Sequence, residues 1–88
     1  MLPDSELNTL HADAAMAVML AVDGDVRNGM EILLAGLRRT EELEADEAWA
    51  GELSARYRKA INGYSRRFGC YPLLLQDLPE LTGAATLR

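Results

Sequence analysis

With 88 residues, 49% of them hydrophobic and 26% charged, the chain has the composition of one ordinary globular domain built around a single core. Its one cysteine, Cys70, and one histidine, His11, exclude a disulfide framework and a four-ligand zinc site within one chain. No apolar run is long enough to span a membrane, and the first residues lack the pattern of a signal peptide, so we expect a cytoplasmic protein. The excess of arginine over lysine and the abundance of alanine are typical of bacteria with GC-rich genomes.

The first predicted helix covers residues 5–22, with Asp4 or Ser5 as its N-cap. Apolar residues recur in it at spacings of three and four, as on the buried face of a helix: Leu7, Leu10, Ala14, Ala17, Val18 and Ala21. Gly24 can take the left-handed conformation that ends a helix, and Asp25 can cap the next one. This short turn predicts that the first two helices are antiparallel neighbours.

The second predicted helix covers residues 26–43. Its apolar stripe consists of Val26, Met30, Leu33 and Leu37. Gly29 and Gly36 lie seven residues apart along one edge of the stripe. Because a glycine inside a helix costs about 1 kcal/mol relative to alanine, we expect both to permit the close approach of another helix.

The acidic stretch 40–47 contains neither glycine nor proline, so one continuous helix over residues 26–68 is an alternative. The helical phase argues against it. The stripe through Leu33 and Leu37, continued at 3.6 residues per turn, misses the next large apolar residues by about a third of a turn. A break near 44–46 brings both stripes back to one core.

A third helix over residues 47–68 is therefore predicted, with Asp46 as its N-cap and Gly69 after its end. Its inward residues are Trp49, Leu53, Tyr57, Ala60, Ile61, Tyr64 and Phe68. The fold class is all-α, an antiparallel three-helix bundle over residues 1–71. We expect one core shared by Leu33, Leu37, Trp49, Tyr57, Ile61 and Tyr64.

The C-terminal segment, residues 72–88, contains five leucines within nine residues: Leu73, Leu74, Leu75, Leu78 and Leu81. Pro72 suits the first turn of a short helix and Pro79 would end it. Exposed together, the leucines would form an apolar patch of a kind that monomers rarely keep. Two alternatives follow: the segment packs on the bundle, which we favour, or it meets a partner or a second copy.

Residues 15–40 resemble a tetratricopeptide-type helical hairpin, because Gly24, Asp25, Gly29, Leu33 and Gly36 match the spacing of its turn, small and bulky positions. They depart from that family in having glycines for alanines, no aromatic residues in the first helix and no closing proline. The bundle also resembles the three-helix domain that binds short helical motifs on trafficking proteins. Both resemblances imply an interaction scaffold and no catalysis.

No residue set with catalytic, cofactor-binding or metal-binding chemistry stands out. We expect His11 to be either a buried, hydrogen-bonded residue or an edge residue of the first helix, and no partner for acid–base chemistry is fixed in sequence. Cys70 is expected to be a half-buried thiol, with an exposed reactive thiol as the alternative. The acidic residues of 41–47 lack the ligand pattern of a calcium loop and predict a solvated corner.

Charge is segregated along the chain: residues 1–53 hold twelve acidic and three basic side chains, and residues 54–76 hold five basic and no acidic ones. We expect these halves to neutralise one another, with a basic surface for an anionic partner as the alternative. The acidic sequence pI, about 4.7, and the absence of interleaved aromatic residues argue against nucleic acid.

The predicted function is a non-catalytic protein–protein interaction module that needs no cofactor. A structural homodimer is the first alternative, and an anion- or nucleic-acid-binding protein that uses the basic third helix is the second. The expected partner is another protein or a second copy of the chain, and we expect no membrane binding. The candidate partner-binding residues are Leu73, Leu74, Leu75, Leu78, Leu81, Arg56, Lys59, Arg66 and Arg67.

Overall fold

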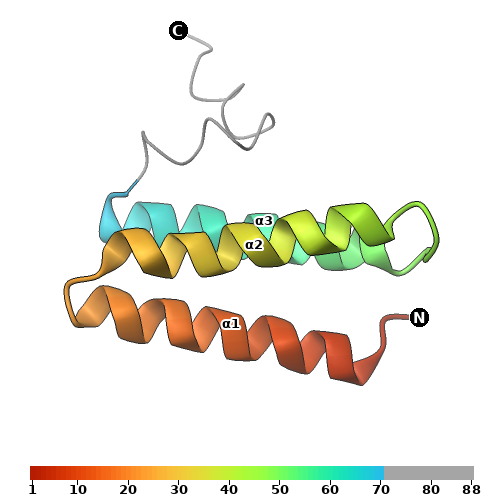
Figure 1. The fold of residues 1–88 in the computed structure, drawn as a ribbon, viewed down its shortest axis with the longest axis horizontal. Helices are drawn as coiled ribbons and strands as arrows, with labels where there is room; N and C mark the ends of the chain where they lie inside the picture. Colours follow the sequence, from red (N-terminus) through yellow and green to blue (C-terminus); the bar gives the residue numbers. More distant parts are fainter. Residues whose placement is uncertain (71–88) are drawn as a thin grey trace, which may run out of the picture.

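The computed structural model describes residues 1–70, which form three helices: α1 (Asp4–Val22), α2 (Val26–Leu43) and α3 (Ala50–Phe68) (Figure 1). Consecutive helices run antiparallel, and α2 packs closely against both α1 and α3. The contact between α1 and α3 is much sparser. The predicted all-α antiparallel bundle is thus confirmed. The C-terminal segment, residues 72–88, with its predicted short helix between Pro72 and Pro79, lies outside the described residues.

The turn between α1 and α2 has the predicted chemistry. Gly24 adopts a left-handed backbone with φ of 97°, a conformation that costs glycine little and most other residues more. Asp25 caps α2, because its carboxylate accepts hydrogen bonds from the backbone N–H of Asn28 at 3.4 Å and from its side-chain amide at 2.8 Å. The tight reversal keeps α1 and α2 adjacent along their length.

The predicted start of the third helix at residue 47 is wrong, and so is the role of Asp46 as its N-cap. The backbone N–H groups of Asp46 and Glu47 donate to the carbonyl of Leu43, at 3.0 and 2.9 Å, so this stretch closes the end of α2. Helix α3 begins at Ala50, and its N-cap residue Trp49 makes no side-chain capping bond. The break itself is confirmed, but the connection is one turn longer than predicted.

The start of α1 also differs slightly from the prediction. Pro3 occupies the N-cap position, and its carbonyl accepts from the N–H groups of Glu6 and Leu7, both at 3.1 Å. Asp4 and Ser5 therefore belong to the first turn. There the negative carboxylate of Asp4 interacts favourably with the positive end of the helix dipole.

Side chains from all three helices meet in one buried core: Leu10, Ala17, Ala21, Met30, Leu33, Leu34, Leu37, Leu53, Tyr57, Ile61 and Tyr64. Five of the six predicted core residues are among them, and the sixth, Trp49, packs against the core while half-buried. The indole N–H of Trp49 donates to the Glu47 carboxylate at 3.1 Å. The large aromatic side chain at this end thus covers the core rather than filling it.

Gly29 and Gly36 provide the space for two tyrosine side chains of α3, as the close-approach prediction requires. A methyl group on Gly36 would lie 2.6 Å from Cζ and 2.8 Å from the hydroxyl oxygen of Tyr57. One on Gly29 would overlap the hydroxyl of Tyr64 and lie 2.6 Å from the carbonyl oxygen of Ala17 in α1. Both glycines therefore admit rings that fill the space between all three helices.

Candidate functional site

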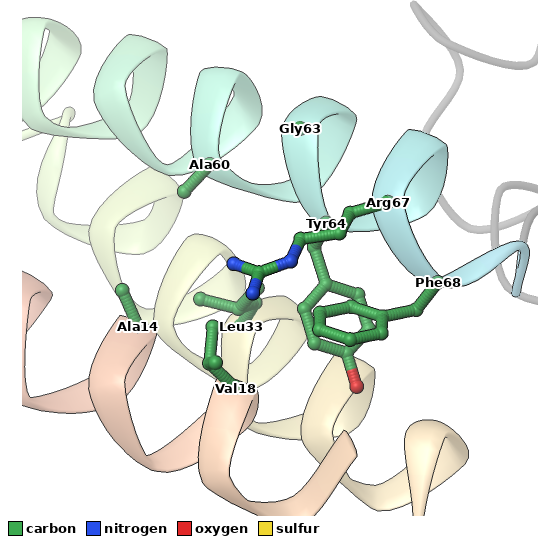
Figure 2. A pocket seen from close by; sticks show the side chains of 8 residues that line it. All are labelled: Ala14, Val18, Leu33, Ala60, Gly63, Tyr64, Arg67 and Phe68. Carbon is green, nitrogen blue, oxygen red and sulfur yellow. The ribbon is translucent and has the colours of Figure 1, made fainter. Parts of the chain in front are cut away.

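A groove lies between α1 and α3, the two helices that contact each other least (Figure 2). We call it the α1–α3 groove. Its volume is about 300 Å³, at the small end of the range for ligand pockets. It is lined by Ala14 and Val18 of α1, Leu33 of α2, and Ala60, Gly63, Tyr64, Arg67 and Phe68 of α3.

Small residues at helical spacing explain why this groove remains open. On α3, Ala60, Gly63 and Arg67 follow one another at intervals of three and four, so they form one row along the helix. The first two have little or no side chain to fill the space. On α1, Ala14 likewise leaves room beside Val18, so the groove reaches down to Leu33 of α2.

The end of the groove nearest the C-terminus of α3 is aromatic and positively charged. The rings of Tyr64 and Phe68 pack with their centroids 4.9 Å apart. The guanidinium carbon of Arg67 lies 5.0 Å from the centre of the Phe68 ring, a distance at which a cation is attracted to the ring face. Figure 2 shows the Arg67 side chain extending over the groove. An apolar ligand with a negative charge would find both complementary features here.

The predicted basic residues of α3 divide into two groups. Arg56 is paired within its own helix with Glu52 at 3.0 Å, and Arg58 reaches Glu41 of α2, also at 3.0 Å. The second pair supports mutual neutralisation of the acidic and basic halves. The three exposed cations of α3 that have no ion-pair partner among residues 1–70 are Lys59, Arg66 and Arg67. Positive charge therefore remains along the C-terminal half of α3.

A polar network that the sequence analysis missed joins α1 to the other two helices. The hydroxyl of Tyr57 donates to the carboxylate of Asp13 at 2.7 Å, and Arg39 pairs with Glu6 at 2.9 Å. Burial, together with the bond to Asp13, raises the pKa of Tyr57 to about 12, while the guanidinium of Arg39 opposes this rise. These bonds link residues 33 and 44 positions apart, which no local pattern reveals.

The outer face of α1 is unusually apolar. Three large side chains are well exposed there: Met16 at 56%, Met19 at 68% and Val22 at 69%. From Ala14 to Val22 the helix carries no charged or polar side chain. The apolar wall of the groove thus continues around α1 onto its solvent-facing side.

The remaining candidates for chemistry have structural or solvent roles. His11 is exposed on α1, and Asp13 points instead to Tyr57. Cys70 is half-buried against the core, and burial raises the pKa of its thiol, which opposes thiolate formation. Within residues 1–70, no three acidic, histidine or cysteine side chains gather as a metal site would require.

The five leucines predicted to bind a partner, Leu73, Leu74, Leu75, Leu78 and Leu81, lie outside the described residues. The sequence predicted an interaction module but did not locate this groove. The row of small residues in α3, which includes Ala60 and Gly63, was the available signal. No family model, curated protein or solved structure matches the chain. Among residues 1–70, no helix combines the length and hydropathy needed to cross a bilayer.

Proposed function

We propose that this chain is a non-catalytic protein-interaction module whose α1–α3 groove binds an apolar segment of a partner protein. The observation that carries the proposal is the groove itself, apolar at its base and bounded at one end by Arg67. Amphipathic helices commonly bind in such grooves between two helices, with apolar side chains inserted at intervals of three and four. A partner segment with leucine-like and acidic residues fits this surface best.

The resemblance to tetratricopeptide hairpins and to the three-helix domain that binds helical motifs supports the same class of function. The shared features, Gly24-Asp25 and the small residues Gly29 and Gly36, serve helix packing in this chain. The resemblance therefore supports a scaffold that presents helix surfaces. It contributes no binding residue of its own to the proposal.

A homodimer is the second candidate, favoured by the exposed apolar face of α1. Met16, Met19 and Val22 recur at intervals of three, so they form one stripe that a second copy could cover. An anionic partner bound by Lys59, Arg66 and Arg67 is the third. It is weaker, because no aromatic platform accompanies Lys59 and Arg66 on the solvent face of α3.

Site-specific photocrosslinking in cells of the source organism tests the proposal. A photoreactive residue replaces Gly63, which lines the groove and has open space around it, or Ala35, an exposed control position on α2. We expect Gly63 alone to crosslink one defined protein, through an apolar segment of it, and Val18→Glu to abolish the product. Products common to both positions, or none at all, would contradict the proposal. A crosslink to a second copy would favour the homodimer.

A further inference from the structure

We propose that the α1–α3 groove is the docking site of this chain's own leucine segment, residues 73–81, which a partner must displace. The geometry of the groove and the sequence of the segment support the docking itself. Only the displacement rests on the proposed function. The segment fits the groove in its reach, its apolar side chains and its charge.

The groove lies within easy reach of the segment. Helices α1 and α3 run in the same direction, so their C-terminal ends lie at the same end of the bundle (Figure 1). Phe68, the last residue of α3, lines the groove, and Cys70 packs against the core two residues later. From Phe68 back to Ala60 the helix rises about 12 Å. The four residues from Cys70 to Leu73 already span up to about 10 Å, so the segment can follow the groove without strain.

The side chains of the segment match the groove. Leu74 and Leu78 lie four residues apart, so the short helix predicted between Pro72 and Pro79 would present both on one face, and Leu81 follows soon after its end. The groove offers an apolar surface formed by Val18, Leu33 and Phe68, among others. Docking would remove leucine side chains from water, at about 25 cal/mol for each Å² of apolar surface covered.

Charge favours the same occupant. The segment contains two acidic residues, Asp77 and Glu80, and no basic one. Arg67 lines the groove, and Lys59 and Arg66 add positive charge on the solvent face of the same helix. None of the three has an ion-pair partner among residues 1–70. An acidic, leucine-rich segment therefore complements this side of the bundle in both polarity and charge.

A segment in the same chain is favoured over the same segment in a second copy. A short flexible connection holds a ligand near its site at an effective concentration in the millimolar range. At micromolar protein concentration, intramolecular docking therefore exceeds the intermolecular reaction by a factor on the order of 1000. We accordingly assign the groove to the segment of its own chain.

Disulfide trapping in the full-length chain tests this docking without any partner. In a Cys70→Ser background, Asp77→Cys keeps all five leucines and lies three residues from Leu74, so in a helical segment it borders the leucine face. It is combined with Val18→Cys in the groove. The matched control combines it with Ala35→Cys on the exposed face of α2. We expect the Val18 pair to form an intramolecular disulfide at least about tenfold faster than the control pair, because proximity raises the effective thiol concentration.

A further variant checks that the leucines cause the difference. Leu74→Asp with Leu78→Asp should bring the rate of the Val18 pair down to that of the control, and circular dichroism verifies that the helices remain. Equal rates for the two original pairs would overturn the docking, and so would disulfide-linked dimers as the main product. The photocrosslinking experiment of the preceding section can fail while this one succeeds, so the two proposals fail separately.

Discussion

The two contacts that α3 makes in the bundle differ sharply. Against α2, it inserts Tyr57 and Tyr64 over two glycines, and the hydroxyl of Ser54 donates to Thr40 at 2.9 Å, so the contact is closed and fully buried. Against α1, it presents Ala60 and Gly63, and a groove of about 300 Å³ remains. Against α2, helix α3 thus places large side chains opposite small ones. Against α1, it places small side chains opposite small ones.

This difference separates a surface that maintains the fold from one available for binding. Where Gly36 receives Tyr57, little change of volume is tolerated, because close-packed interiors have few voids to absorb it. Where Ala60 lies across the groove from Ala14, the surface can accept further atoms. Substitutions on the two sides should therefore differ in size and even in sign.

The largest effect is expected at Leu37, which is completely buried in the core. Leu37→Ala should lower the free energy of unfolding by about 2 to 5 kcal/mol, because it removes buried methyl groups and leaves a cavity. A loss of this size is a large fraction of the total stability of so small a domain. Urea denaturation followed by circular dichroism measures the change. Met19→Ala, at an exposed position of α1, is the control and should stay within about 0.5 kcal/mol.

Gly36→Ala should destabilise the fold by about 1 to 3 kcal/mol, although alanine gains about 1 kcal/mol of helix propensity. The added methyl would overlap the ring of Tyr57, which is fully buried, so the ring or the helix would have to shift. Thermal and urea denaturation measure the net effect. A variant that melts above the parent would show that the ring can shift and that the contact is not close-packed.

Tyr57→Phe should cost about 1 to 2 kcal/mol, because the carboxylate of Asp13 loses a hydrogen-bond donor at 2.7 Å. The ring is retained, so packing over Gly36 is unchanged. Tyr64→Phe is the matched comparison, since its hydroxyl donates to the uncharged carbonyl of Val26 at 2.6 Å. Losing that bond should cost less, because the acceptor carries no full charge.

Alkaline pH provides a second measurement of the Tyr57 environment. Its pKa is raised to about 12 in the folded protein, against an ordinary value of 10.0. Folding therefore favours the protonated phenol, and this contribution is complete below pH 10 and lost as the pH rises from about 10 to about 12. The stability difference between parent and Tyr57→Phe should shrink over that range. A difference that is constant from pH 8 to pH 12 would contradict the assigned environment.

The sequence predicts the helices well because their signals are local. Apolar spacing defines α2 to the residue, and Gly24 with Asp25 defines the turn before it. The start of α3 escapes prediction because Asp46 has the chemistry of an N-cap. Its N–H instead bonds back to Leu43, and this choice depends on how α2 and α3 meet in space.

The site is predictable only in part, for the same reason. The row from Ala60 to Arg67 can be read from sequence, but its position opposite Ala14 depends on the angle between α1 and α3. The bond between Asp13 and Tyr57 depends on how far the ring extends past Gly36. These relations arise from packing three helices together, and periodicity within one helix does not contain them.

The smallest effect should have the opposite sign. Gly63 lies on the groove side of α3, and a methyl group there would meet no atom of the described structure within 4 Å. Gly63→Ala should therefore raise the free energy of unfolding by up to about 1 kcal/mol, the difference in helix propensity between the two residues. Ala55→Gly, at an exposed interior position of the same helix, is the control and should lose as much as Gly63→Ala gains. A gain at Gly63 equal to that loss would show that nothing lies close against Gly63. Denaturation of the full chain measures the change. A smaller gain at Gly63 would show that the occupant of the groove reaches the rim of the groove at Gly63. A loss as large as that of Gly36→Ala would show that the two sides of α3 do not differ in packing.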